Sequence, residues 1–398
     1  MRILYASDNF PYPLTSGLLR HYHLIRGLAA RHEIDLLSMV GADFREEHRA
    51  GIQPYVSRIE TFRSVARNRS IVVKATRRAI DHIVAGGAEA ASVALAARAE
   101  ELHAAHPYDV VVLSGRRPYP VASVIGSTPL VVDLCDATSA RLATNLIYAS
   151  APRRALLRYQ MGLARTNERR LIARSEHLLF ASARDRDEVL DGASKPDASV
   201  LPNGVDHEYW QRRSEVLGDE VVFSGAMHYP PNDDAARFLL GEVMPHVWQE
   251  APDTRVRIVG RDPTERLRAI ASDDPRVTIT GFVDDVRPHL EHGAVYAAPL
   301  RFASGIQNKL LEAMAMEIPV ITSPVAAAGL RDDTAEPPIL VVENDPPGFA
   351  HEILMALARA RSDPRPDEAS RRFVVERFRW DRAVEILEEV LEDVRRAS

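Results

Sequence analysis

The residues that most suggest chemistry surround Lys309. This lysine follows Ser304 and Gly305, in a segment whose pattern predicts an apolar strand at 295–299, a short loop, and a helix that opens near Ile306. A lysine in the first turn of a helix is unfavourable, because the positive end of the helix dipole repels a cation. An anion would complete such a site, and phosphate is the usual candidate because free backbone N–H groups and the dipole both attract it.

Glu312 and Arg301 are further charged residues of the same segment. Lys309 and Glu312 are three residues apart, so they share one face of the predicted helix. That face offers a cation for phosphate and a carboxylate that could accept hydroxyl groups of a sugar or a ribose, and Arg301 adds a second cation at the end of the strand. The alternative is a solvated salt bridge on an ordinary helix, and these residues alone leave both readings open.

Other candidates follow the ends of predicted strands. Gly17 precedes a helix after the first strand, where a glycine lets the backbone approach a ligand closely, although a plain turn would use it too. Asp136 could orient an acceptor hydroxyl as a base, or could cap a helix. His228 and Arg261 end two strands of the second half and could face a ligand.

The run Leu311-Glu312-Ala313-Met314-Ala315 resembles the donor-binding signature of the family-4 retaining glycosyltransferases, which have the GT-B fold. In that family a first glutamate lies seven residues before the second, and here that position is Ser304. The stretch from Gly305 to Lys309 is similar to a subgroup of sugar transferases associated with bacterial exopolysaccharide systems.

The resemblance also implies how a donor is bound. Phe282 and Val283 follow Gly281 in a loop that resembles the one holding the donor base. Gly225 lies where many relatives carry Gly-Arg and then a lysine; neither cation is present here, so we expect Lys309 and Arg301 to stabilise the diphosphate. The expected catalytic residues are Lys309, Arg301, Glu312 and Asp136, and the expected donor-binding residues are Gly17, Gly225, His228, Arg261, Phe282, Val283, Ser304, Gly305, Ile306, Gln307 and Asn308.

These residues need two α/β halves to position them. Short apolar runs alternate with helical patterns from Ile3 to Ala181, and the pattern restarts at Val221 after a turn-rich segment. We therefore expect two Rossmann-like domains facing a cleft, with ligands at the carboxyl ends of strands. The predicted domains are 1–202, on the acceptor side, and 203–376, which binds the nucleotide sugar. The resemblance implies that the last helix, 377–398, returns to the first domain.

Composition excludes several classes of protein. A net charge of −6 over 398 residues gives no general attraction to nucleic acid, and a single cysteine, Cys135, fits a reducing cytoplasm. No zinc, nicotinamide or P-loop motif occurs, so we expect neither an obligatory metal nor a cofactor. The arginines between Arg153 and Arg174 could touch anionic lipid at a membrane surface, although a solvated helix face would explain them better.

The predicted function is transfer of a hexose-like sugar from a nucleotide diphosphate to an acceptor hydroxyl, with retention. The acceptor could be a small molecule, a glycan or a lipid-linked glycan. Two alternatives remain: a nucleotide-sugar epimerase or phosphorylase of the same fold, and a non-catalytic protein that binds sugar nucleotides. The loss of the first glutamate, at Ser304, favours keeping the second alternative.

Overall fold

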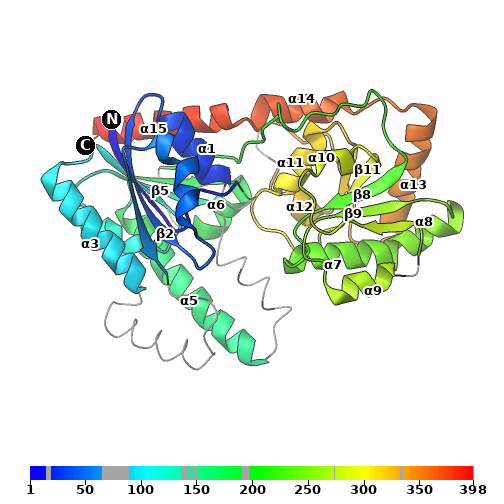
Figure 1. Ribbon diagram of the computed structural model, residues 1–398, viewed down its shortest axis with the longest axis horizontal. Helices are drawn as coiled ribbons and strands as arrows, with labels where there is room; N and C mark the ends of the chain where they lie inside the picture. Colours follow the sequence, from blue (N-terminus) through cyan, green and yellow to red (C-terminus); the bar gives the residue numbers. More distant parts are fainter. Residues whose placement is uncertain are drawn as a thin grey trace. The chain divides into compact units, whose positions relative to one another are not determined.

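The chain divides into two compact units. Unit 1 comprises Met1–Pro202 and Trp380–Ser398, and unit 2 comprises Asn203–Arg379. The structure is a computed structural model that describes residues 1–14, 19–64, 89–135, 142, 146, 151–190, 197–272, 274–331 and 335–397. Each unit is a parallel β-sheet with helices on both faces, and each is described by itself below (Figure 1).

Unit 1 is built on a seven-stranded sheet in the order β3-β2-β1-β4-β5-β6-β7. The central strands of this sheet, such as β1 and β4, are apolar and buried, which is typical of parallel sheets covered by helices on both faces. The order reverses between β1 and β4, whose carboxyl ends therefore meet at a switch point. The strands are β1 (Arg2–Ser7), β2 (Glu33–Val40), β3 (Arg58–Arg63), β4 (Val110–Ser114), β5 (Leu130–Cys135), β6 (His177–Phe180) and β7 (Ala198–Val200).

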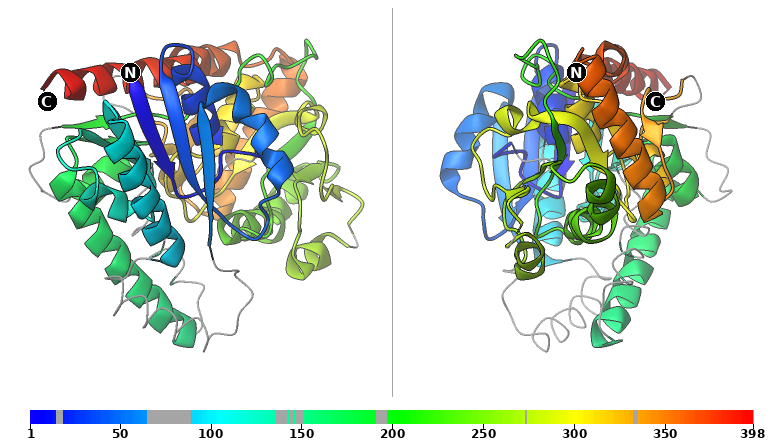
Figure 2. Two further views of the ribbon diagram at one scale, coloured as in Figure 1. Left: turned by 60° about the vertical axis from the view of Figure 1, so that its left-hand side comes forward. Right: turned by 90° about the vertical axis from the view of Figure 1, so that its right-hand side faces the viewer.

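Alternate residues of β1 serve the two faces of this sheet. Ile3 and Tyr5 join the core under α1 (Leu19–Leu28) and α15 (Trp380–Ala397). Leu4 and Ala6 join the opposite core, which includes α3 (Ala90–Ala105) and the end of α5 (Ala151–Arg174). Figure 2 shows α3 and α5 on one side of the strands and α15 on the other. Within the described ranges, unit 1 also contains α6 (Ala183–Leu190) and short 3-10 turns at Glu46–Gly51, Gln53–Tyr55 and Tyr119–Ser123.

A buried ion pair joins the helix and strand ends of unit 1. The Arg20 guanidinium donates from Nε to Oδ2 of Asp133 over 2.7 Å and from Nη2 to Oδ1 over 3.0 Å. It also donates to the carbonyl oxygen of Leu201 over 2.7 Å. Asp133 is 1% exposed and Arg20 is 4% exposed, so removal of either partner would leave the other charge buried without compensation.

Unit 2 is built on a six-stranded sheet in the order β10-β9-β8-β11-β12-β13. The strands are β8 (Glu220–Ser224), β9 (Val256–Val259), β10 (Val277–Ile279), β11 (Gly293–Ala298), β12 (Val320–Thr322) and β13 (Leu340–Val341). Figure 1 shows α7 and α9 on one side of β8 and β9, with α11 on the other. The helices are α7 (Pro230–Phe238), α8 (Met244–Glu250), α9 (Glu265–Ala271), α10 (Arg287–Leu290), α11 (Asn308–Ala315), α12 (Pro324–Ala327), α13 (Pro346–Ser362) and α14 (Glu368–Arg377), and a π-helical turn, Leu239–Val243, joins α7 to α8.

The expected α/β fold class with two Rossmann-like units is confirmed. The expected return of the last helix is confirmed as well, since Trp380 of α15 stacks on His23 of unit 1 with 4.5 Å between the ring centroids and 4° between the planes. The last helix, expected over 377–398, begins at Trp380. The preceding helix, α14, ends before Phe378, whose φ of −118° and ψ of 45° are not helical and whose carbonyl oxygen accepts from the Val205 N–H over 2.7 Å.

Candidate active site

The candidate site of unit 2 lies where its strand order reverses. β8 and β11 are neighbours in the sheet, and the chain leaves them toward opposite edges. Their carboxyl ends continue into the loop 225–229, which enters α7, and the loop 299–307, which enters α11. In open α/β sheets ligands bind at such a point, because the diverging connections leave a crevice between them.

Lys309 is the second residue of α11 and reaches across the reversal point. Its ammonium donates to Oδ1 of Asn232, in the first turn of α7, and lies 5.7 Å from the centre of the Phe223 ring of β8. Burial lowers the pKa of Lys309 to about 8, an effect that the nearby Glu312 carboxylate partly offsets. The lysine is therefore held in place by a neutral side chain and remains mostly protonated at neutral pH.

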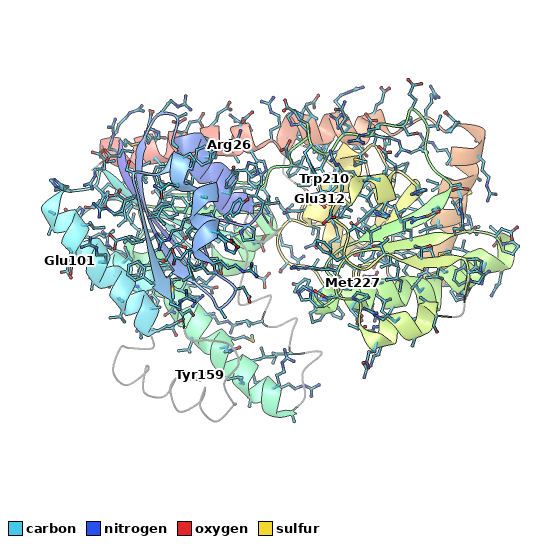
Figure 3. The ribbon with its side chains drawn as sticks, viewed as in Figure 1. Arg26, Glu101, Tyr159, Trp210, Met227 and Glu312 are labelled. Atoms are coloured by element: carbon cyan, nitrogen blue, oxygen red, sulfur yellow. The ribbon has the colours of Figure 1, made fainter. Side chains whose placement is uncertain are left out.

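Glu312 lies one turn along the same helix face as Lys309. Burial raises the pKa of its carboxyl to about 7, and the Lys309 ammonium opposes that rise. Within the described residues, no hydrogen-bond donor contributes to the pKa of this carboxyl. Figure 3 labels Glu312 on α11 and Met227 in the loop between β8 and α7. A partly buried carboxylate of this kind is able to accept hydrogen bonds from ligand hydroxyls.

Arg301 differs from the expected clamp residue because it belongs to an ion pair. Its Nε and Nη2 donate to the two carboxylate oxygens of Asp234 over 2.8 and 2.6 Å, and Asp234 is only 3% exposed. Its guanidinium also lies 5.0 Å from the centre of the Phe238 ring. The pair compensates the charge of Arg301, whereas the hydrogen-bond acceptor of Lys309, on α11, is the uncharged Asn232.

Two glycines shape the loops around Lys309. Gly225 has a φ of 156°, and a Cβ there would come within 2.6 Å of Nδ2 of Asn232. Gly305 has a φ of 63°, in the left-handed region that favours glycine. The close approach at Gly225 fixes Asn232 from one side, and its Nδ2 donates to the carbonyl oxygen of Ala226 over 3.0 Å.

Helix α11 begins later than predicted. It opens at Asn308, whereas the sequence predicted an opening near Ile306. The reason is Gln307, which has a φ of −86° and a ψ of 90° and donates from its side chain to the carbonyl oxygen of Ser304 over 2.9 Å. Oδ1 of Asn308 accepts from Nδ2 of Asn203 over 3.1 Å. Ser304, Ile306 and Gln307 therefore belong to the loop, and Ile306 is 9% exposed.

The other predicted donor residues lie on neighbouring loops of unit 2. His228 and Arg261 are exposed, and Nδ1 of His228 lies 3.2 Å from a carboxylate oxygen of Asp262. The N–H of Met227 donates to the carbonyl oxygen of Arg261 over 2.9 Å, which ties the loops after β8 and β9 together. Phe282, after β10, is 71% exposed.

Some predicted residues cannot be placed, and others were missed. Gly17 and Asp136 lie outside the described residues. Asn232 and Asp234 were missed, although they contact Lys309 and Arg301. Their signal was the sequence Pro230-Pro231-Asn232-Asp233-Asp234, which places polar side chains at the start of a helix just after a strand ends.

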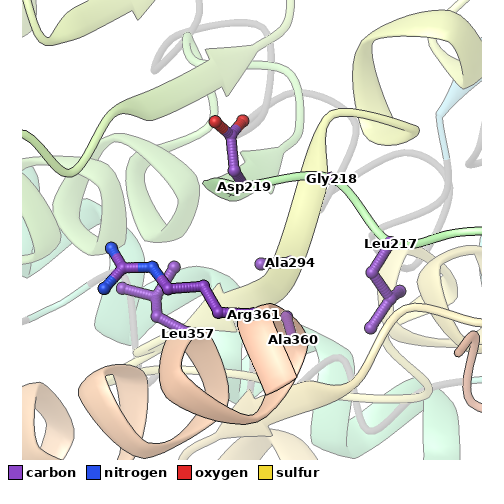
Figure 4. Close-up of a pocket in the computed structure, with 7 residues that line it drawn as sticks. All are labelled: Leu217, Gly218, Asp219, Ala294, Leu357, Ala360 and Arg361. Carbon is purple, nitrogen blue, oxygen red and sulfur yellow. The ribbon is translucent and has the colours of Figure 1, made fainter. Parts of the chain in front are cut away.

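A pocket of about 280 Å³ opens elsewhere in unit 2 (Figure 4). It lies at the amino ends of β8 and β11 and contains none of the predicted site residues. Its lining consists of Leu217, Gly218, Asp219, Ala294, Leu357, Ala360 and Arg361. Among the described residues, no group of three or more His, Cys, Asp and Glu side chains could hold a metal ion.

None of the helices in the described ranges combines the length and the apolar character that crossing a membrane requires.

Known proteins resemble this chain in sequence and in fold. Residues 218–359 match the family model "Glycosyl transferases group 1". An uncharacterized 44.6 kDa protein in the cps region of Klebsiella pneumoniae is 26% identical over 203 residues, which are 49% of this chain and 51% of that protein. The chain thus spans about half the length of the curated relative it matches.

The solved structures cover the whole chain. Sucrose-phosphate synthase from Thermosynechococcus elongatus has a TM-score of 0.71 at 15% identity, with 100% of both chains covered. HepE of Anabaena in complex with UDP and glucose has a TM-score of 0.66 at 15% identity, with 98% of this chain and 99% of HepE covered. HepE in complex with UDP-glucose also has a TM-score of 0.66, at 14% identity and with 99% and 100% of the chains covered. The fold is therefore GT-B, and residues 218–359 are similar to the group 1 glycosyltransferases.

Proposed function

We propose that this protein is a retaining glycosyltransferase of the family-4 type that moves a sugar from a nucleotide diphosphate to an acceptor hydroxyl. The observation that carries the proposal is the Lys309 ammonium, which Asn232 holds beside the start of α11 at the reversal point of the second sheet. A cation and free N–H groups at that point suit the two phosphates of a sugar nucleotide. The group 1 family match over residues 218–359 supports the same activity.

The chemistry requires stabilisation of negative charge on the leaving diphosphate while the anomeric carbon becomes cationic. In the proposal, Lys309 and the N–H groups near Gly305 and Ile306 stabilise the negative charge of the diphosphate. Arg301, whose side chain is 36% exposed, adds positive charge beside them. Glu312 accepts the ribose hydroxyls, and Ser304 with Gly305 contacts the sugar. Phe282 and Val283 flank the base. HepE binds UDP and UDP-glucose, which supports a nucleotide-sugar donor for this chain too.

The finer parts of the proposal concern the acceptor and the setting. A relative encoded in a cps region supports a polysaccharide or lipid-linked glycan acceptor, and Asp136 stays a predicted acceptor-side residue. We place the reaction in the cytoplasm, with peripheral contact to anionic membrane through α5, and without a metal or cofactor. Arg154, Arg158, Arg165 and Arg169 of α5 are exposed, and their spacing of four, seven and four residues aligns them along one face.

The test combines binding and turnover. A thermal-shift screen across UDP, GDP, ADP and dTDP sugars should give one donor that raises the melting temperature, because ligand binding stabilises the folded state by mass action. With that donor and a panel of acceptors, proton NMR of the new anomeric centre should show the configuration of the donor. Inversion at that centre would refute retention.

Three results would support the alternatives instead. An epimerised donor without acceptor indicates an epimerase, and phosphate-dependent release of sugar phosphate indicates a phosphorylase. Tight donor binding without turnover on any acceptor indicates a non-catalytic binding protein. The pairing of Arg301 with Asp234 favours keeping this last alternative, because it compensates one of the two expected cations.

A further inference from the structure

The first turn of α7 holds a residue that the proposed mechanism does not yet use. Asn232 is 5% exposed and joins three segments: its backbone lies in α7, its Nδ2 donates to the Ala226 carbonyl, and its Oδ1 accepts from Lys309 of α11. Because Nδ2 is committed to a carbonyl acceptor, Oδ1 is the atom of the amide that faces the ammonium. The side chain therefore has one orientation, set by the loop after β8.

The loop after β8 has the shape that this contact requires. A Cβ on Gly225 would come within 2.6 Å of Nδ2 of Asn232, so a larger residue would push the amide away from Lys309. The N–H of Gly225 also donates to the carbonyl oxygen of Val259 over 2.9 Å, which holds the loop against β9. The loop after β8 thus holds Asn232, which in turn holds Lys309 of α11, the helix that follows β11.

We infer that Asn232 is a positioning residue, which sets the place and the protonation of the Lys309 ammonium for the diphosphate of the donor. The inference rests on the proposed function for its ligand. A neutral acceptor suits this task because it orients the ammonium without cancelling its charge. An aspartate at the same place would make an ion pair, as Asp234 does with Arg301, and would compete with the incoming diphosphate.

Among the described residues, Glu312 on the same helix is the charged group that affects the pKa of Lys309. On the elements around it, Asp234 of α7 pairs with Arg301, and His228 pairs with Asp262 on the loops after β8 and β9. The Tyr296 hydroxyl of β11 bonds to Ser224 over 2.9 Å, and burial raises the pKa of that hydroxyl. None of these groups is changed by substitution of Asn232, so a shift in the titration of Lys309 in such variants would report on Asn232 itself.

The test needs no ligand. Acylation of Lys309 by an amine reagent, followed by mass spectrometry of its peptide at pH 6 to 10, measures the fraction of neutral amine. We expect a midpoint near pH 8 in the wild type. In Asn232→Asp the carboxylate favours the ammonium and should raise the midpoint by at least one pH unit, which lowers the neutral fraction at pH 8 roughly fivefold. In Asn232→Leu, which keeps the branching of the side chain but removes the acceptor, the midpoint should fall.

A second readout connects the inference to the ligand. At pH 7, UDP affinity measured by calorimetry should fall at least tenfold in Asn232→Asp, because the carboxylate occupies the ammonium. Asp233→Asn is the matched control: it changes the adjacent residue of α7, which pairs with Arg237 over 2.8 Å, and should leave the Lys309 midpoint in place.

The outcomes separate this inference from the proposed function. An unchanged midpoint in both Asn232 variants, with native thermal unfolding, would overturn the positioning role. A wild type that binds no nucleoside diphosphate would refute the proposed function, while a shifted acylation midpoint in the same protein would still uphold the link between Asn232 and Lys309.

Discussion

Replacement of Glu312 by glutamine should stabilise the protein at alkaline pH and leave its stability at acid pH unchanged. Burial raises the pKa of Glu312 from an ordinary 4.5 to about 7. Between these values the folded protein binds more protons at this site than the unfolded chain, so the free energy of unfolding falls as pH rises from 4.5 to 7. Above pH 7 the full cost of the ionised carboxylate is present.

The magnitude follows from the size of the shift. Each unit of pKa corresponds to about 1.4 kcal/mol, so a rise from 4.5 to about 7 costs at most about 3 kcal/mol above pH 7. Loss of the carboxylate also removes the support that it gives to the Lys309 ammonium, so we expect a net gain of about 1–3 kcal/mol in Glu312→Gln at pH 8. For a unit of this size, each kcal/mol shifts the melting temperature by roughly 2–4 °C.

Differential scanning calorimetry from pH 5 to pH 8.5 measures this effect in unit 2. The melting temperatures of wild type and Glu312→Gln should coincide at pH 5 and separate by several degrees at pH 8, with the variant higher. Glu250→Gln, at an exposed residue of the same unit, is the control and should show no such divergence. A difference that is constant across pH, or a variant that is less stable at pH 8, would refute the reasoning.

The remaining predictions concern charge elsewhere in the protein. UDP affinity should decrease above about pH 8, by up to tenfold per pH unit, as Lys309 loses its proton; calorimetry showing a flat affinity from pH 7 to pH 9.5 would contradict this. Asp133→Asn should destabilise unit 1 by about 3–5 kcal/mol in urea unfolding, because it leaves Arg20 buried without its partner, and a loss below about 1 kcal/mol would show that the pair contributes little. The double variant Arg158→Glu/Arg165→Glu should lose cosedimentation with phosphatidylglycerol vesicles at low salt without a change in UDP affinity, whereas equal binding by wild type and variant would remove α5 from the membrane proposal. Tyr159, exposed on the same helix (Figure 3), is a milder test, since Tyr159→Ser should weaken vesicle binding less than the charge reversal.

The fold could be predicted because its signals are local. Apolar runs such as Val110–Ser114 and Val256–Val259 are short, bounded and buried on both faces, and they became strands of parallel sheets as expected. The strands that the sequence did not reveal lie at or near sheet edges. Arg58–Arg63 is mostly polar, and Leu340–Val341 has only two residues, so neither carries an apolar pattern.

The sequence indicated only those candidate site residues that lie close together in one segment of the chain. The spacing of Lys309 and Glu312 is a property of one helix, so the sequence alone places both residues on one helix face. Burial lowers the pKa of Lys309 and raises the pKa of Glu312. Their partners come from about seventy residues earlier in the chain: Asn232 for Lys309, and Asp234 for Arg301. Nothing in the spacing of Arg301 indicates that a buried aspartate would pair with it, because that pairing depends on β8 and β11 being neighbours.

The most direct test of the account is the affinity of wild type and Lys309→Ala for UDP and the other nucleoside diphosphates, measured by calorimetry at pH 7. The account predicts that the wild type binds at least one of them and that Lys309→Ala, with the same melting temperature without ligand, binds it at least tenfold more weakly. Equal affinity of the two proteins for the same diphosphate would contradict it.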